Sequence, residues 1–284
     1  MKGTYAKSVC EVKKNLVNRT VWVSAAAVII VIVIAASTYY YFAYIWSNPN
    51  PSPSVSPTTT PTSSATSPVS TDLNWGGYGV ASDFNNPQPV VTGVSGSWVV
   101  PEVAVSQNDT FSAIWVGIGG LFGKTLIQTG TEQDCINGAV SYYAWYELLP
   151  SDSVTITTMN VSPGDKISAS ITLSDPTLDL WTISINDLSN GQSFNQDFIY
   201  AAGRLSAEWV VERPTVDNVL SHLADFGVVT FSHCSAEVNN KSENLGDLHS
   251  VELLLSNRHR NQLVEVSNIS SDGSSFTVKY LVSQ

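Results

Sequence analysis

The strongest constraint on this chain is an alternation of apolar and polar residues along residues 72–284. Apolar side chains alternate with serine, threonine or asparagine over 167–173 and 181–186, and the pattern returns over 275–282. Successive side chains of a β-strand point to opposite faces of its sheet, so a period of two predicts strands with one buried face. Many such strands at short spacing predict an all-β fold, a sandwich of two antiparallel sheets.

Two short segments interrupt this pattern and favour helices. We expect a helix over 214–225, because Pro214 and Thr215 are typical of a helix start and the apolar residues after them follow helical spacing. A second short helix is expected near Leu248–Leu254.

The first 71 residues have a different composition. Residues 21–46 carry no charge and are longer than the roughly 20 residues that a membrane-spanning helix needs. All the flanking basic residues lie before this segment, so the positive-inside rule predicts a cytoplasmic tail over 1–20 and an extracellular remainder. A long cleaved signal peptide, which would make the domain secreted, is the alternative. Residues 47–71 are rich in Pro, Ser and Thr and predict an extended stalk.

The domain at 72–284 is sparsely charged and acidic. The chain has 13 Lys and Arg against 24 Asp and Glu. Five of these bases and one acid precede residue 47, which leaves eight bases and 23 acids. A nucleic-acid-binding protein needs a basic surface, so this balance argues against that partner. If crowded carboxyl groups have raised pKa values, the domain is more stable in acid than at neutral pH.

The residue patterns indicate no metal and no cofactor, because neither H-E-x-x-H nor C-x-x-C spacing occurs. Cys135 and Cys234 both follow the apolar segment and could form one disulfide. No G-x-S-x-G motif supports a serine hydrolase. A glycosidase with paired carboxylates stays open through Glu147, Glu208 and Glu212.

Polar residues with apolar neighbours mark the candidate groove. In the strand 205–212, Ala207 and Trp209 share an apolar face, so Glu208 points the other way, into solvent or a groove. On periodicity alone, Glu208 is a solvated carboxylate. Gln128 and the aromatic strand 141–147 also combine polar side chains with apolar or aromatic neighbours. An aromatic groove with a few polar groups is typical of a ligand site.

Seven short motifs then add what periodicity cannot. They span nearly all of 74–282 and read N-W-G-G-Y (74–78), V-S-G-S-W-V-V-P (94–101), W-V-G-I-G-G (115–120), I-Q-T-G (127–130), A-W-Y-E (144–147), A-E-W-V-V-E (207–212) and A-D-F-G-V-V-T-F (224–231). In this order and spacing they resemble the glutamic peptidases (eqolisins), which are pepstatin-insensitive acid endopeptidases.

The resemblance implies a lectin-like, concanavalin-like sandwich of two curved sheets with its active site on the concave face. It implies a catalytic pair, Gln128 and Glu208, with Trp115 and Trp145 lining the substrate groove and Glu147 supporting it. Glu208 would activate a water and Gln128 would stabilise the oxyanion, without an acyl-enzyme or a metal. The expected partners are protein or peptide substrates, and we expect a monomer.

Two other functions remain to be compared with an acid endopeptidase. One is a non-catalytic, lectin-like binding module at the cell surface, which would have no need of a Gln and Glu pair. The other is the glycosidase, which requires a second essential carboxylate. The sequence also departs from the fungal members of the family, because a neutral stalk stands where they carry a removable pro-segment.

Overall fold

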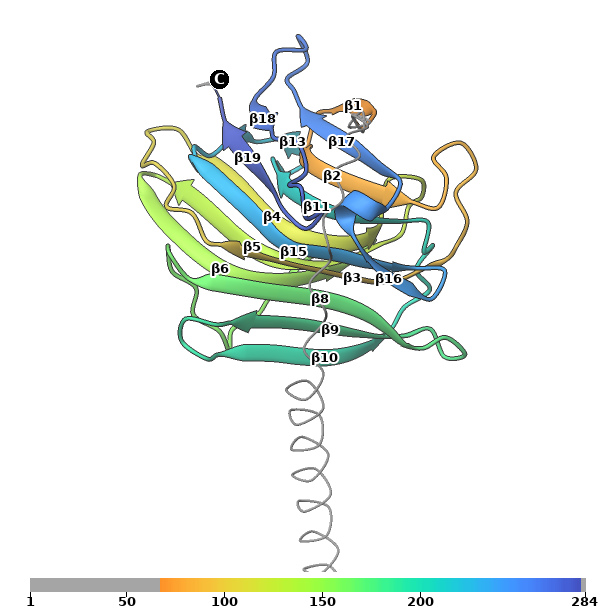
Figure 1. The fold of residues 1–284 in the computed structure, drawn as a ribbon. Helices are drawn as coiled ribbons and strands as arrows, with labels where there is room; N and C mark the ends of the chain where they lie inside the picture. Colours follow the sequence, from red (N-terminus) through yellow and green to blue (C-terminus); the bar gives the residue numbers. More distant parts are fainter. Residues whose placement is uncertain (1–66, 282–284) are drawn as a thin grey trace, which may run out of the picture. The chain divides into compact units, whose positions relative to one another are not determined.

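The computed structural model describes residues 67–281, and almost all of their regular structure is β-strand (Figure 1). The strands at the alternating segments confirm the expected pattern. In β8 (Lys166–Asp175), Ile167, Ala169 and Ile171 are buried, while the residues between them are partly exposed. The next strand, β9 (Leu180–Asp187), buries Trp181 and the apolar residues after it in the same way.

The strands form two large sheets, and long strands such as β5, β6 and β8 curve along their length (Figure 1). The nine-stranded sheet has the order β1 (Val69–Asp72), β17 (Ser250–Leu255), β2 (Trp75–Ala81), β11 (Ser206–Glu212), β4 (Thr110–Gly119), β5 (Leu126–Ile136), β6 (Ala139–Leu148) and β7 (Val154–Thr155), with β14 (His222–Leu223) paired to β4. The eight-stranded sheet has the order β10 (Ser193–Ile199), β9, β8, β3 (Val91–Val99), β15 (Val228–Val238), β19 (Phe276–Tyr280) and β18 (Val264–Val266), with β16 (Lys241–Asn244) paired to β15.

The main core fills the space between the two sheets, and two tryptophans also hydrogen-bond across it. The Trp209 indole of β11 donates to the Ser95 carbonyl of β3 at 2.7 Å. The Trp98 indole of β3 donates to the Thr131 hydroxyl of β5 at 3.0 Å. A buried polar group without a hydrogen-bond partner destabilises a fold. These two bonds satisfy the indole N–H groups, so the large aromatic side chains are buried without that cost.

A second apolar cluster lies on the other face of the nine-stranded sheet. Along β11, Ala207, Trp209 and Val211 belong to the main core, whereas Val210 belongs to the second cluster with Trp115. Alternate residues of a strand point to opposite faces, so the second cluster lies on the outward face of this sheet. The sequence assigned Ala207 and Trp209 to the core face correctly.

Both expected helices are wrong. Residues 214–225 form a small hairpin, β12 (Thr215–Val216) and β13 (Val219–Leu220), followed by β14. Asp217 and Asn218 have positive φ angles of 50° and 63°, in the left-handed region. Two such residues make a two-residue hairpin turn and are incompatible with a right-handed helix. Residues 250–255 form β17 because they pair with β2 and β1, and only η1 (Leu245–Asp247), a single 3₁₀ turn, precedes them.

The domain begins earlier in the chain than the sequence analysis predicted. The predicted stalk runs to residue 71, but Val69–Asp72 pairs in parallel with β17 and so belongs to the sheet. The expected cytoplasmic tail, membrane segment and remaining stalk, residues 1–66, lie outside the described residues. Over 67–281 no helix has the length and apolar character to cross a membrane.

The disulfide that the sequence allowed does not form, since Cys135 and Cys234 are both free, buried thiols. Cys135 lies on β5 of one sheet, where its sulfur accepts a hydrogen bond from the Ser106 amide. Cys234 lies on β15 of the other sheet and packs in the main core. Each thiol therefore behaves as a small core side chain.

Candidate active site

One lateral row of residues crosses five strands of the nine-stranded sheet. In antiparallel register, Glu208 lies between Gly79 and Gly117, Gly117 pairs with Gln128, and Gln128 pairs with Glu147. Directly paired residues share a face of the sheet. The side chains of Glu208 on β11 and Gln128 on β5 therefore point to the same face, with only β4 between their two strands. At the usual strand spacing their Cα atoms lie about 10 Å from each other.

The glycine between the two candidates leaves room for the neighbouring side chains of Trp115 and Gln128. A Cβ atom at Gly117 would lie 3.3 Å from Cβ of Gln128 and 2.9 Å from the ring of Trp115. Both neighbouring side chains already occupy the room above Gly117. A larger residue there would push Gln128 away from Glu208.

Gln128 is 4% exposed and held by Glu147, because its Nε2 donates a short hydrogen bond to Oε2 of that carboxyl group. Its Oε1 is buried without a partner among the described residues. Burial raises the pKa of Glu147, and the hydrogen bond from Gln128 opposes this. The structure thus brings these two predicted site residues together.

Glu208 is fully buried, at 0% exposure, where the sequence pattern alone predicted a solvated carboxylate. Its side chain points to the expected face, but the loop that joins β4 to β5 folds over it. Leu121 of this loop occupies the space above Gly79, the direct neighbour of Glu208, since a Cβ there would lie 2.6 Å from Leu121 Cδ1. The Leu121 amide also faces the Glu208 carboxyl group.

The burial of Glu208 sets its protonation. Burial raises its pKa well above the usual range, while the Ser206 hydroxyl and the Leu121 amide lower it to a smaller extent. Neither carboxyl oxygen makes a hydrogen bond of ordinary geometry with the described residues. An unpaired buried carboxylate is costly, so the covered side chain is neutral in acid.

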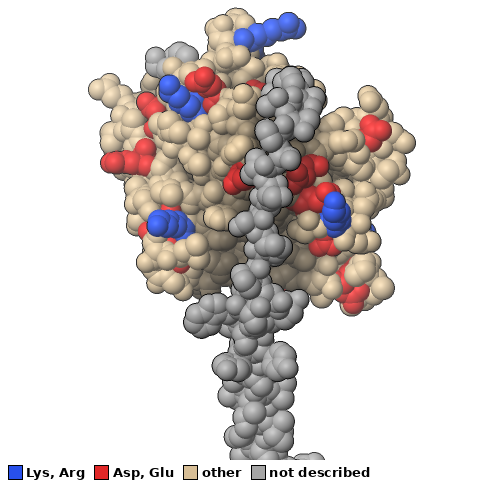
Figure 2. All heavy atoms as spheres, viewed as in Figure 1, with Lys and Arg blue, Asp and Glu red and all other residues tan. Residues whose placement is uncertain are grey.

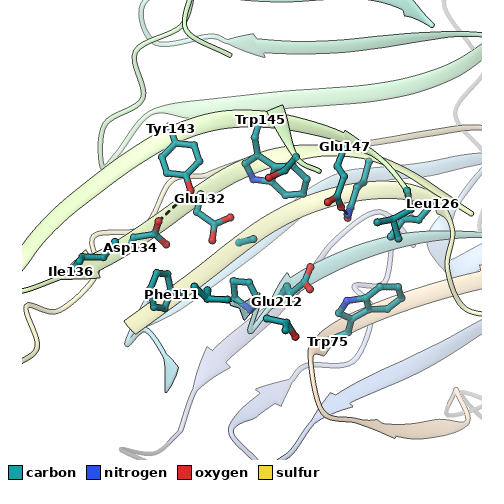
Figure 3. Close-up of a pocket in the computed structure, with 17 residues that line it drawn as sticks. Trp75, Phe111, Leu126, Glu132, Asp134, Ile136, Tyr143, Trp145, Glu147 and Glu212 are labelled. Carbon is teal, nitrogen blue, oxygen red and sulfur yellow. Dashed lines mark hydrogen bonds between the residues drawn. The ribbon is translucent and has the colours of Figure 1, made fainter. Parts of the chain in front are cut away.

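A groove of about 520 Å3 follows β5 beside this row. Figure 3 shows side chains from neighbouring strands projecting into it. Its lining combines aromatic and acidic residues with one amide: Trp75, Phe111, Tyr143, Trp145, Glu132, Asp134, Glu147, Glu212 and Gln128. Of the predicted substrate-binding residues, Trp145 and Glu147 line the groove.

Trp115, predicted to line the groove, lies beneath it instead. It is fully buried and packs edge-to-face on Trp75 with ring centres 5.0 Å apart. Its indole donates a 2.7 Å hydrogen bond to Oε2 of Glu212. Trp115 therefore supports the groove floor and holds the Glu212 carboxyl group in place. Its own side chain is not exposed to the groove.

Three further acidic residues line the groove: Glu212, which the sequence analysis considered only for a glycosidase, and Glu132 and Asp134, which it did not select (Figure 3). Burial raises the pKa of Glu212 to about 7 and that of Asp134 to about 6. Burial, with Asp134 next, raises the pKa of Glu132 well above its usual range. The Tyr143 hydroxyl donates to Asp134 at 3.2 Å. The period-two spacing of Glu132 and Asp134 from Gln128 was the signal that could have found them.

The groove contains no evident metal centre, and no group of three His, Cys, Asp or Glu residues within 67–281 has the arrangement to hold an ion. Its polar side-chain groups are carboxyl groups, one amide, indole N–H groups and the hydroxyls of Tyr143, Ser153 and Thr215. Such a set can bind and move protons and donate hydrogen bonds to a developing negative charge.

Comparison with known proteins agrees with this geometry. Residues 73–280 match the Peptidase A4 family. Aspergillopepsin-2 of Aspergillus niger is 29% identical over 187 residues, 57% of this chain and 64% of the relative, so the match spans just under two thirds of that protein. Scytalidopepsin B of Scytalidium lignicola is 26% identical over 226 residues, 75% of this chain and 80% of the relative.

The fold is similar to a solved structure as well. A crystal structure of scytalido-glutamic peptidase with a transition state analog inhibitor superposes with a TM-score of 0.62, covering 74% of this chain and 99% of the other at 23% identity. The family match over residues 73–280 places this domain among the glutamic-type peptidases, and the two-sheet fold agrees with that match. The chain belongs to the Peptidase A4 family, the eqolisins.

Trp115 beneath the groove and Trp145 in its lining offer a matched test of the hydrogen bond to Glu212. Trp115→Phe removes the indole donor that lowers the pKa of Glu212, so we expect that pKa to rise above about 7. Trp145→Phe is the control, because the Trp145 indole N–H has no partner among the described residues. Carboxyl NMR titration measures both. Equal shifts in the two variants would contradict the assignment.

The raised pKa values predict that the domain loses stability as pH rises. A carboxyl group whose pKa is higher folded than unfolded stabilises the fold below its unfolded pKa, and this contribution disappears as pH passes the folded value. For Glu212 the window runs from 4.5 to about 7. Glu132 and Glu208 act in the same direction. The pKa values of Asp175 and Asp272 shift downward, but both are fully exposed and screened.

We expect denaturant midpoints to fall through this window, and Glu212→Gln, neutral at every pH, to flatten the fall. Glu265→Gln, an exposed carboxyl on β18, is the control. A stability that climbs steadily from acid to neutral pH would refute the prediction.

Proposed function

We propose that this protein cleaves peptide bonds in acid, with Glu208 as the group that activates water and Gln128 as the group that stabilises the oxyanion. The observation that carries the proposal is the lateral row in which Gly117 alone separates the two side chains. A carbonyl carbon that reached the space between the two side-chain ends would have a carboxyl group on one side and an amide donor on the other.

Gln128 is suited to donate to an oxyanion because its amide cannot titrate. Its Nε2 carries two hydrogens, of which Glu147 accepts one, so the other is available for a substrate oxygen. The bond to Glu147 also fixes which end of the amide faces that side of the groove. Donors held in place before the reaction need no reorganisation as charge develops.

Glu208 would act first as a base and then as an acid. As carboxylate it accepts a proton from water while the water oxygen attacks the carbonyl carbon, and it then gives the proton to the leaving amine. In the covered arrangement Glu208 is neutral, so the base form requires the loop at residues 120–125 to move and admit water. Leu121 thus controls access to this carboxyl group.

The groove supports an extended peptide as the substrate. It follows β5 from Leu126 to Ile136 and its walls are aromatic, which suits a polypeptide with mixed side chains. Trp145 contributes a buried indole N–H without a partner among residues 67–281, a donor available to a peptide carbonyl.

Cleavage of an acid-denatured protein, with pepstatin and a chelator present, tests the proposal. We expect the full chain to cleave at about pH 4, where carboxyl groups are near their reference pKa. Glu208→Gln and Gln128→Ala should each lower kcat/KM by about 10² to 10³-fold, the usual effect of losing such a group.

Glu265→Gln and Gln196→Ala are matched controls, since both side chains are exposed on β18 and β10 and should leave kcat/KM unchanged. No cleavage by the unaltered chain would favour a binding module. Undiminished cleavage by both site variants would remove the assigned pair from the mechanism.

We further propose that the domain lies outside the cell and is tethered by residues 21–46. The supporting observations are the charge-free segment, the basic residues before it, and four exposed asparagines in N-x-S/T sequons at 108, 160, 240 and 268. We expect the chain to stay with membranes in alkaline carbonate while added protease reaches the domain on intact cells. A soluble product that begins after residue 37 would show a cleaved signal instead.

A further inference from the structure

A second concavity gathers positive charge in this acidic domain. Acidic side chains are spread over the face shown in Figure 2 with a few basic ones among them. Yet Arg213, His222, Arg258 and His259 line one hollow of about 350 Å3, and no carboxyl group is part of its lining. We call this hollow the cationic pocket. It lies behind the β12–β13 hairpin, which also forms a wall of the groove.

The floor of the cationic pocket is a buried guanidinium group. Arg213 is 4% exposed, and its Nε and Nη2 both donate to the Leu73 carbonyl, at 3.1 and 2.6 Å. Burial lowers the pKa of Arg213, the charge of Arg258 lowers it further, and Asp72 raises it. The two guanidinium groups are therefore close enough to repel each other, and an anion between them would relieve that repulsion.

The rim is a tight loop between β17 and β18. Oδ1 of Asn257 accepts hydrogen bonds from the amides of His259 and Asn261, at 2.9 and 3.0 Å. The Asn257 amide in turn donates to the Asn261 carbonyl at 2.9 Å. These bonds hold the loop backbone in place and so determine the positions from which the side chains of Arg258 and His259 project. His222 approaches from β14 on another part of the sheet.

Arg213 is tied into the fold through the Leu73 carbonyl, whereas the other three charged side chains of the pocket are not held by carboxyl groups of the described residues. Within residues 67–281, His222, Arg258 and His259 form no ion pair with any carboxyl group. Oγ of Ser221, which also lines the pocket, is buried and has no hydrogen-bond partner there. The pocket thus offers guanidinium, imidazole and hydroxyl donors that converge on one space from three segments of the chain.

We propose that the cationic pocket binds a tetrahedral oxyanion, phosphate or sulfate, either free or as the end group of a monoester. Planar guanidinium groups pair with such oxygens in a bidentate way, and imidazole N–H groups donate hydrogen bonds to them. Acid neutralises carboxyl groups elsewhere on the surface, so the pocket then dominates the local potential. Val219 and Leu220 give it an apolar wall where the organic part of a monoester would rest.

Calorimetric titration of the full chain at about pH 5 tests the proposal, with inorganic phosphate, inorganic sulfate and phenyl phosphate as probes and acetate for comparison. We expect a Kd of about 1 mM for phosphate, well within the reach of a ligand of this size. Arg258→Gln combined with His259→Gln should weaken binding by about 10- to 100-fold, as loss of charged hydrogen bonds does. Tighter binding of phenyl phosphate identifies a monoester, and equal binding identifies the free ion.

The matched control is Lys166→Gln combined with Lys279→Gln, which removes two exposed cations elsewhere and should leave the affinity unchanged. His222→Gln, on a separate strand, should weaken binding without touching the loop. Absence of binding, equal loss in the control, or acetate binding as tight as phosphate binding would each overturn the proposal. None of these results depends on peptidase activity.

Discussion

The antiparallel register of β11, β4 and β5 is the constraint on which the rest of the site depends. It aligns Glu208, Gly117 and Gln128 in one row, so the separation of the two polar side chains follows from strand spacing rather than from loop conformation. A shift of one residue in either pairing would turn one of these side chains into the main core. The rows next to it carry the tryptophans and carboxyl groups of the groove for the same reason.

Burial of acidic groups is the second constraint, and it links stability to chemistry. The groove places Glu132, Asp134 and Glu212 close together, with raised pKa values, where few basic groups could neutralise them. Such a cluster is tolerable when it is protonated and costly when it is ionised. The low charge of the domain thus suits an acidic setting, where both the fold and a proton-transferring carboxyl group work best.

The sequence predicted the parts of this structure that depend on local patterns. Alternation predicted the strands and the face of each one, and the family resemblance predicted that Gln128 and Glu208 belong to one site. The burial of Glu208 and the position of Trp115 beneath the floor were not predictable, because loop residue Leu121 and groove residue Trp75 reach them from distant parts of the chain. The false helix over 214–225 arose because helical spacing of apolar residues outweighed the turn signal at Asp217 and its neighbour.

The tryptophan behind the lateral row limits how this domain can be divided. Trp209 follows Glu208 directly in the chain and is hydrogen-bonded to the backbone of the opposite sheet. The position of the Glu208 carboxyl group therefore depends on both sheets. A fragment containing only the nine-stranded sheet, or a graft of its motifs onto another single-layer scaffold, would lack the hydrogen bond to the second sheet. The smallest unit that keeps the geometry of the lateral row is the complete two-layer domain.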